Sequence, residues 1–390
     1  MSSVYLVDGA RTGFGSFGGS LKDVAPVELG LVTAEAALKK AGIEPTQVQD
    51  VVYGNVIHAS TNAAYIARHT ALKAGVPVEV PALLVNRLCG SGLQAVISSA
   101  QQLVSEGNNY ALCGGIENMS MSPHATYTQR FSGPKMGTLA LEDMLLHTLT
   151  DQYIGVPMGI TAEALADQYQ ITRQQQDEFA LLSHQRAAAA TAAGRLEEEM
   201  ISVPLGKKGS FCQDERIKED SSLEQLGSLR ASFKKEGTVT AGNASGINDG
   251  AVSLILAHEQ MIRTSHVKPL ARIVNWSVCG VDPGRMGLGP VPAITNVLQK
   301  SGLTSEDIDL FEINEAFAVQ YLAVEKELQL NREKTNVNGG AIALGHPVGA
   351  SGSRLLLTLA YELKRRDKRY GIASLCIGGG QGIAMLIENV

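Results

Sequence analysis

The sequence has few cysteines, and none of them is in a paired arrangement. Five cysteines are spread over 390 residues with no Cys-x-x-Cys pair, which gives neither a disulfide framework nor a zinc-ribbon spacing. We therefore expect a reducing compartment, the cytoplasm, and no metal site.

Long apolar runs and an excess of positive charge are also missing. No run approaches the roughly 20 apolar residues that cross a bilayer, and no basic region with an apolar stretch precedes the strand-like residues 4–7. Lys and Arg number 33 against 39 Asp and Glu, a formal net charge of −6. We expect no membrane and no nucleic-acid partner, and a polyanionic ligand needs a local positive patch.

What the sequence does contain is enough apolar material for a large core. Hydrophobic residues make up 44% and charged residues 18% of the chain, which excludes a disordered, collagen-like or coiled-coil protein. The length allows two or three domains or one large compound unit.

Two regions about 260 residues apart repeat the same order of features. Residues 26–55 and 290–314 both predict a helix that begins near proline, a glycine turn, and a strand that ends in asparagine. A strand that carries a cysteine followed by glycines occurs at residues 112–115 and again at 375–379. The separation in sequence is nearly the same as that between the first two regions. Chance similarity of αβ units is the alternative, but the shared shift favours duplication.

The duplication sets the predicted domain organisation. We predict an N-terminal half over about residues 1–265, with an inserted domain at about 120–248, and a C-terminal half over about 266–390. Strands such as 82–87 and 109–113 alternate with helices such as 91–106 and 353–364, which predicts α/β halves packed around a shared helical layer. Active sites in such sheets lie at the carboxyl ends of the strands.

Cys89 lies between an apolar strand and an amphipathic helix, in Asn-Arg-Leu-Cys-Gly-Ser-Gly. We expect the glycines to allow a sharp turn, and the helix amides and dipole to favour a thiolate. Cys89 is therefore a candidate nucleophile. A buried structural cysteine is the alternative.

His346 lies at the bend of a glycine-dense loop, residues 338–352, that leads into a helix. In a functional site it polarises the Cys89 thiol or donates to an oxyanion. The alternative is an anion-binding turn in which the imidazole is merely hydrogen-bonded.

Two further strand ends hold candidate catalytic residues. Cys376 ends an apolar strand before Gly378, and because another strand follows, these glycines suit an oxyanion hole rather than a dinucleotide fingerprint. Asn314 ends a strand where its amide could orient a water; a helix cap is the alternative.

Together these motifs resemble the thiolases, the acetyl-CoA acyltransferases. The resemblance covers essentially the whole chain and rests on N-R-L-C-G-S-G at Cys89, G-N-A-S-G at Ser245, N-E-A-F at Asn314, G-H-P-V-G-A-S-G at His346 and C-I-G-G-G-Q-G at Cys376. It implies two similar halves in a five-layered α-β-α-β-α core with an inserted loop domain, which agrees with the repeat. It also implies a homotetramer made of two dimers; residues 119–135 are a possible contact loop.

The resemblance also assigns roles. Cys89 would carry the acyl group as a thioester, His346 would activate it, and Cys376 would remove or return the α-proton. Asn314, through a water, and His346 would stabilise the enolate oxygen, and the amides of Cys89 and Gly378 would hold the tetrahedral oxyanion. Two cysteines are needed because an acyl carrier must be a good nucleophile and leaving group, whereas the carbon acid needs a separate base.

The substrates implied are acetyl-CoA, acetoacetyl-CoA or 3-ketoacyl-CoA, and CoA, with no other cofactor. By resemblance Ser245 contacts the pantetheine arm, while Lys218 and Ser221 lie where the family binds the nucleotide. A lysine replaces the family's frequent arginine there, which weakens any expectation of stacking on adenine. Basic residues could form the required positive patch, although a solvated face is the alternative; these are Lys207, Lys208, Arg216 and Lys218.

One departure concerns substrate choice. Many acetoacetyl-CoA-specific thiolases have His-Met-Gly where this chain has Pro157-Met158-Gly159, a form that resembles the broader-range 3-ketoacyl-CoA thiolases. We expect acetyl transfer with tolerance for longer chains.

Three other functions compete. A decarboxylating ketosynthase shares the fold but has a histidine where Cys376 stands. A Cys/His/Asn hydrolase would use Cys89, His346 and Asn314 and leave Cys376 without a role. A carrier that kept the fold but lost the chemistry does not explain the complete set of motifs.

Overall fold

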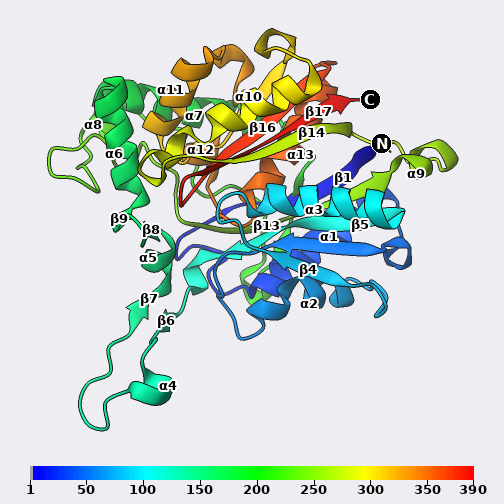
Figure 1. Cartoon of the computed structure of the whole chain (residues 1–390), viewed down its shortest axis with the longest axis horizontal. Helices are drawn as coiled ribbons and strands as arrows, with labels where there is room; N and C mark the ends of the chain where they lie inside the picture. The colour runs from blue at the N-terminus through cyan, green and yellow to red at the C-terminus, as the bar shows by residue number, and fades with distance from the viewer. Residues whose placement is uncertain (1–2) are drawn as a thin grey trace.

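Nine strands form one hydrogen-bonded path through the middle of the molecule (Figure 1). The computed structural model describes residues 3–390; Met1 and Ser2, the start of the predicted N-terminal half, lie outside the described residues. In order across the sheet the strands are β4 (Ala82–Val85), β3 (Asp50–Gly54), β5 (Tyr110–Asn118), β13 (Asn248–His258), β1 (Val4–Thr12), β14 (Ala271–Gly280), β17 (Gln381–Asn389), β16 (Tyr370–Ile377) and β15 (Leu310–Ile313).

The two sides of this path repeat one topology. β3 and β5 are parallel, and β13 and β1 then follow antiparallel; β15 and β16 are parallel, and β17 and β14 follow antiparallel. β1 and β14 join the two sides through a short antiparallel contact, Val4 to Leu6 against Ala271 to Ile273. The strand order confirms the two similar halves predicted from the sequence repeat.

Helices cover both outer faces and fill the space between the halves (Figure 1). α1 (Pro26–Ala41) and α2 (Ile66–Lys73) lie on the outer face of the first half, and α10 (Pro290–Ser301) and α11 (Ala318–Leu328) lie on that of the second. α3 (Ser91–Glu106) and α13 (Ser351–Arg365) contact each other in the middle. The arrangement is the predicted five-layered α-β-α-β-α core.

The corresponding helices begin and end with the same chemistry. α1 and α10 both have proline at the first helical position, where its missing N–H costs nothing. Both end at a left-handed glycine, Gly42 with φ 66° and Gly302 with φ 65°. In the middle layer, apolar side chains such as Leu103 of α3 and Leu359 of α13 are buried in one cluster that spans both halves.

The chain between β5 and β13 leaves the core and forms its own helices. α6 (Met158–Tyr169) and α7 (Arg173–Ala192) pack against α11 and α12 (Ala341–Leu344) of the second half. The segment around α4 (Gln129–Ser132) extends away from the body (Figure 1). Its tip exposes Phe131 and Met136, 93% and 91% accessible.

The remaining elements are short. They are β2 (Gly15–Ser16), β6 (His124–Ala125), β7 (Glu142–Asp143), α5 (Met144–Thr148), β8 (Thr150–Asp151), β9 (Val156–Pro157), β10 (Met200–Ile201), β11 (Val203–Pro204), β12 (Ser210–Phe211), α8 (Leu223–Gly227) and α9 (Glu259–Thr264). Over residues 3–390, no helix has the length and apolarity to span a membrane.

β5 differs most from the sequence prediction, which ended this strand at Cys113. The strand continues through Gly114 and Gly115 to Asn118 because β13 pairs with it along its whole length. Glycine is needed at these positions because the neighbouring backbone approaches closely. A Cβ on Gly114, for example, would lie 2.0 Å from the Val252 carbonyl oxygen.

Candidate active site

Cys89 lies on a tight turn just before α3. Leu88 has φ 46°, a left-handed conformation that is uncommon for a branched apolar residue and is typical of constrained functional sites. Hydrogen bonds hold the turn: Asn86 Oδ1 accepts from the Leu88 N–H at 3.0 Å, and the Ser91 hydroxyl donates to the Leu88 carbonyl at 2.7 Å. The turn presents the Cys89 side chain at the carboxyl end of β4.

The glycines beside Cys89 do not form the turn, so that part of the sequence prediction was wrong. Gly90 has φ −85°, open to any residue. Both glycines instead allow close packing between the halves. A Cβ on Gly90 would lie 2.5 Å from Ile377 Cδ1, and one on Gly92 would lie 2.8 Å from the Ser353 nitrogen.

The surroundings of Cys89 oppose the thiolate that the helix terminus was expected to favour. Burial raises the pKa of Cys89 to about 11, and the Gly378 N–H, which donates to the sulfur, only partly offsets this. Removal of the thiol proton therefore requires a base close by. The contact also brings Gly378, predicted as an oxyanion donor, to the nucleophile.

His346 is the base that the sequence predicts. It lies between α12 and α13, 5% exposed, and its backbone N–H donates to Asn248 Oδ1 at 2.9 Å. The Ser351 hydroxyl donates to the Pro347 carbonyl, so we assign the 2.6 Å contact between His346 Nδ1 and Ser351 Oγ as a donation from the ring. This tautomer leaves Nε2 as an acceptor.

The imidazole is uncharged near neutral pH. Burial, with a smaller effect of the positive charge on Arg354, lowers the pKa of His346 to about 3. Nε2 lies 3.3 Å from Asn314 Nδ2. Asn314 is fully buried, and because α11 begins only at Ala318, it is not the cap of that helix.

Cys376 lies at the end of β16 and shares the site with Cys89. Burial raises the pKa of Cys376, and negative charge on Cys89 raises it further, so the two sulfur atoms lie within electrostatic reach of each other. Leu88 and Met158 border the same space: a Cβ on Gly378 would lie 3.1 Å from Leu88 Cδ1 and 3.3 Å from Met158 Sδ.

The two halves thus contribute to one site. Cys89 contacts the apolar cluster that contains Val348, two residues after His346. Cys89, Gly378 and Cys376 thus interact with one another, Asn314 contacts His346, and the Val348 cluster brings the His346 loop to the side of Cys89. Cys113, in contrast, is fully buried in the core.

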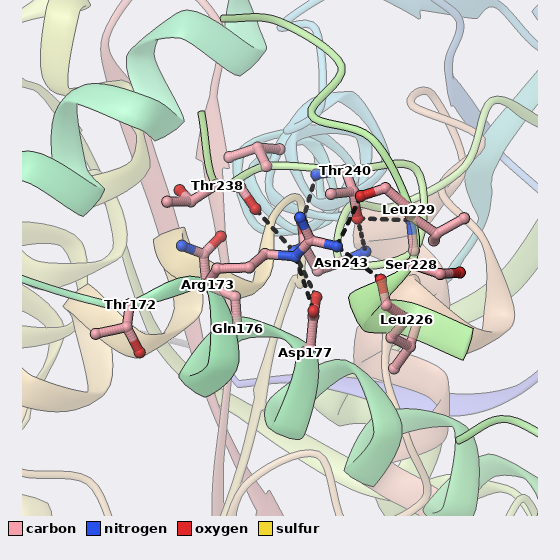
Figure 2. A network of polar contacts seen from close by, with 12 residues as sticks. Thr172, Arg173, Gln176, Asp177, Leu226, Ser228, Leu229, Thr238, Thr240 and Asn243 are labelled. Carbon is pink, nitrogen blue, oxygen red and sulfur yellow. Dashed lines mark hydrogen bonds and ion pairs between the residues drawn. The ribbon is translucent and has the colours of Figure 1, made fainter. Parts of the chain in front are cut away.

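Ser245 follows Asn243, which a network of polar contacts holds in place (Figure 2). Its N–H donates to the Ala316 carbonyl at 2.9 Å, next to the Asn314 segment. Two residues earlier, Asn243 donates to Asp177 Oδ1 at 2.8 Å, and Asp177 Oδ2 accepts from Arg173 Nε at 2.7 Å. These contacts hold Ser245 beside the Asn314 segment.

Lys218 and Ser221 lie further out, and Lys218 is exposed. The Lys218 N–H donates to His184 Nδ1 at 3.2 Å, which anchors this stretch to α7. Arg216, part of the predicted basic patch, is occupied: its guanidinium donates to the carbonyls of Ile342, Ala241 and Ala244, each at 2.8 Å. This leaves the lysines as the more available positive groups of the patch.

Sequence reasoning missed the residues that orient the catalytic groups. Ser351 binds the His346 ring, Asn248 holds the His346 backbone, and the buried Glu117 accepts from the Gly349 N–H of the same loop. An acidic residue inside the apolar strand β5 was the available signal for Glu117. In residues 3–390, no cluster of three or more histidine, cysteine or acidic side chains could hold a metal ion.

Comparison with known proteins agrees with this geometry. The family model described as thiolase, N-terminal domain, matches residues 4–260, and that described as thiolase, C-terminal domain, matches residues 267–389. The chain is 50% identical to the mitochondrial 3-ketoacyl-CoA thiolase of Bos taurus, over 100% of this chain and 99% of that protein. It is 46% identical to the acetyl-CoA acetyltransferase of Cupriavidus necator over 100% of both.

A solved structure is equally similar. The human mitochondrial 3-ketoacyl-CoA thiolase in complex with CoA has a TM-score of 0.96 and 48% identity, covering 100% of this chain and 98% of that chain.

Proposed function

Because this chain belongs to the thiolase family, we propose that it condenses two acetyl-CoA to acetoacetyl-CoA and cleaves 3-ketoacyl-CoA by thiolysis, through a thioester on Cys89. The observation that carries the proposal is the pairing of two thiols, the partly buried Cys89 and the buried Cys376, at a site with a neutral imidazole. A hydrolase or a carrier has no use for the second thiol. A ketosynthase has a histidine in its place.

In the first half-reaction Cys89 becomes acylated. His346 Nε2, an acceptor in the assigned tautomer, takes the thiol proton as the sulfur attacks the thioester carbonyl. The backbone N–H groups of Cys89 and Gly378 stabilise the oxyanion. The tetrahedral intermediate collapses, the C–S bond to CoA breaks, and the CoA sulfur receives the proton from His346.

In the second half-reaction a carbon–carbon bond forms. Cys376 first transfers its thiol proton to His346 Nε2, and the resulting thiolate removes an α-proton from the second acetyl-CoA. The His346 Nε2–H and a water held by Asn314 stabilise the enolate oxygen. The enolate carbon attacks the acyl group on Cys89, the Cys89 C–S bond breaks, and the leaving thiolate takes the proton from His346, so that the protein returns to two thiols. Thiolysis follows the same steps in reverse and needs no cofactor besides CoA.

Three residues are proposed to hold the coenzyme. Ser245 contacts the pantetheine arm, which its place beside the Asn314 segment supports. Lys218 and Ser221 contact the nucleotide end, where an exposed lysine offers charge to phosphate.

The substrate range is proposed to extend beyond four carbons. Pro157, the N-cap of α6, precedes Met158, whose sulfur borders the space beside Gly378. Initial rates of thiolysis with 3-ketoacyl-CoA substrates of increasing length check this, and activity confined to acetoacetyl-CoA would contradict it.

The assembly is proposed to be a homotetramer made of two dimers. The exposed apolar tip around α4 and the open edge of β4 support further subunit contacts. Light scattering on the purified protein checks the mass. A cytoplasmic location stays a prediction from the sequence.

Intact-protein mass spectrometry tests the central proposal. After acetyl-CoA treatment we expect one added acetyl group on the wild type, none on Cys89→Ala, and one on Cys376→Ala, which forms slowly and gives no acetoacetyl-CoA. Loss of acylation in both variants to the same degree would contradict the division of labour. Release of free CoA without transfer to a CoA acceptor would favour the hydrolase.

A further inference from the structure

Glu117 is a buried carboxyl that none of the steps above uses. It lies near the end of β5 with 0% exposure and accepts four hydrogen bonds. Oε1 accepts from Asn55 Nδ2 and the Ile57 N–H, both at 3.1 Å. Oε2 accepts from the N–H groups of Val56 and Gly349, both at 3.0 Å. One side chain therefore ties two separate segments to β5.

One of those segments presents the catalytic imidazole. Gly349 lies between His346 and Ser351, whose hydroxyl receives the bond from the ring. The loop lies directly on β5, since a Cβ on Gly115 would be 1.9 Å from the Gly349 carbonyl oxygen. Any loss of the Glu117–Gly349 bond releases the loop that orients His346.

Glu117 has no positive partner within residues 3–390: no lysine, arginine or histidine forms an ion pair with it. Glu312, a buried carboxyl of β15, is by contrast paired with Arg354 at 3.0 Å. Two titratable groups interact electrostatically with Glu117, namely Cys89 and Asp249 of β13. Cys89 packs against the cluster that contains Val56 and Ile57, whose N–H groups Glu117 holds. Burial raises the pKa of Glu117 to about 8, and the charge of Glu117 raises the pKa of Cys89.

We propose that Glu117 is a positioning residue of the acyl-transfer site: its oxygens hold the loop that presents His346, and its negative charge opposes formation of the Cys89 thiolate. The first part rests on the proposed function, whereas the second concerns only the thiol. The four partners of Glu117 are all N–H donors, which suits the ionised carboxylate, and when Glu117 is ionised its charge keeps the resting thiol from ionising.

The charge is tested by the pH dependence of Cys89 alkylation. Wild type and Glu117→Gln are treated with iodoacetamide from about pH 7 to about pH 11, and Cys89 modification is followed by peptide mass spectrometry. We expect the midpoint for Cys89 to move to lower pH in Glu117→Gln. The exposed Cys212 is the internal reference in each sample.

Glu163→Gln is the matched control. Glu163 is also buried and accepts the N–H groups of Thr238 and Val239, but it does not act on Cys89. We expect its Cys89 midpoint to equal that of the wild type. An unchanged midpoint in Glu117→Gln, or the same shift in Glu163→Gln, would overturn the electrostatic part.

Glu117→Asp separates the hydrogen bonds that hold the His346 loop from the negative charge. It keeps the negative charge but shortens the side chain, so we expect the alkylation midpoint to stay near that of the wild type. We expect kcat to fall about ten- to a hundredfold, with KM for CoA within about twofold, because the imidazole is misplaced and the coenzyme loop is not. An unchanged kcat would overturn the positioning part.

The outcomes distinguish this inference from the proposed function. A wild type without acetyl transfer would refute the function, whereas an active wild type with normal Glu117 variants would refute only the inference. If circular dichroism shows that Glu117→Gln does not fold, the kcat of Glu117→Asp decides the positioning part. Cys89 alkylation in Glu117→Asp then decides the electrostatic part. The shorter side chain moves the carboxylate away from Cys89, so the alkylation midpoint should not rise. A midpoint above that of the wild type would overturn the electrostatic part.

Discussion

Asn314 Nδ2 lies 3.3 Å from His346 Nε2, across 32 positions of sequence. With the Ser351 contact on Nδ1, both ring nitrogens have a partner from the second half of the chain. Asn314 Oδ1 is buried and has no protein partner, so an acceptor remains available for a water at the reacting centre.

Replacing Asn314 should impair condensation more than acylation. In Asn314→Ala we expect the condensation rate to fall by about 10²- to 10³-fold, because one donor toward the enolate oxygen is lost. Acylation of Cys89, measured by quenched-flow mass spectrometry, should fall much less. Asn331→Ala, at an exposed position, should retain the rates of the wild type. Equal losses in both half-reactions would place Asn314 outside the enolate step.

Asp177 should affect coenzyme binding rather than chemistry. Asp177→Ala removes the acceptor that holds Asn243 and Arg173, which loosens the loop that carries Ser245 (Figure 2). We expect KM for CoA to rise about tenfold, since a lost buried hydrogen bond costs about 1–2 kcal/mol, with kcat within about twofold. Asp167→Ala, in an exposed ion pair with Lys234, is the control. A fall in kcat alone would contradict this assignment.

His346 should make the protein less stable in acid. Its pKa is lowered from 6.5 to about 3 on folding, so below about pH 6.5 the unfolded chain binds a proton that the folded chain does not. The contribution of His346 to the free energy of unfolding is therefore complete above about pH 6.5 and is lost as the pH falls toward 3. Urea unfolding of His346→Gln should show a smaller decrease in unfolding free energy over this range, whereas His266→Gln, at an exposed position, should not.

A methyl group at Gly115 should displace the catalytic loop. In Gly115→Ala the Cβ would lie 1.9 Å from the Gly349 carbonyl oxygen, so the loop must move to relieve the overlap. We expect kcat to fall by at least about tenfold while the folded structure persists at moderate temperature. Gly227→Ala has open space around its Cβ and is the control. Normal kcat in Gly115→Ala would show that the His346 loop tolerates displacement.

The sequence was most informative where chemistry lies at the ends of elements. Cys89, Asn314 and Cys376 each end or follow an apolar strand, and His346 lies in a glycine-dense loop, so pattern and residue type indicated the same positions. The internal repeat predicted the two halves because each glycine-terminated helix and each strand end recurs with nearly the same shift.

What the sequence could not provide depends on contacts between distant segments. The left-handed residue is Leu88 rather than a glycine, because Gly90 and Gly92 are needed for contact with the second half. The raised pKa of Cys89 follows from burial by both halves, which outweighs any effect of the helix terminus. The role proposed for Glu117 depends on the packing of Gly349 against β5, which the sequence does not show.

The matching strand orders of the two halves also explain why neither can act alone. The nucleophile comes from the turn before α3, whereas the imidazole, the amide and the second thiol come from the later copy. In the proposed function one copy supplies the acyl carrier and the other the proton-handling groups. Two separately produced fragments, divided between residues 260 and 267, would each be inert and would regain turnover only on reassociation.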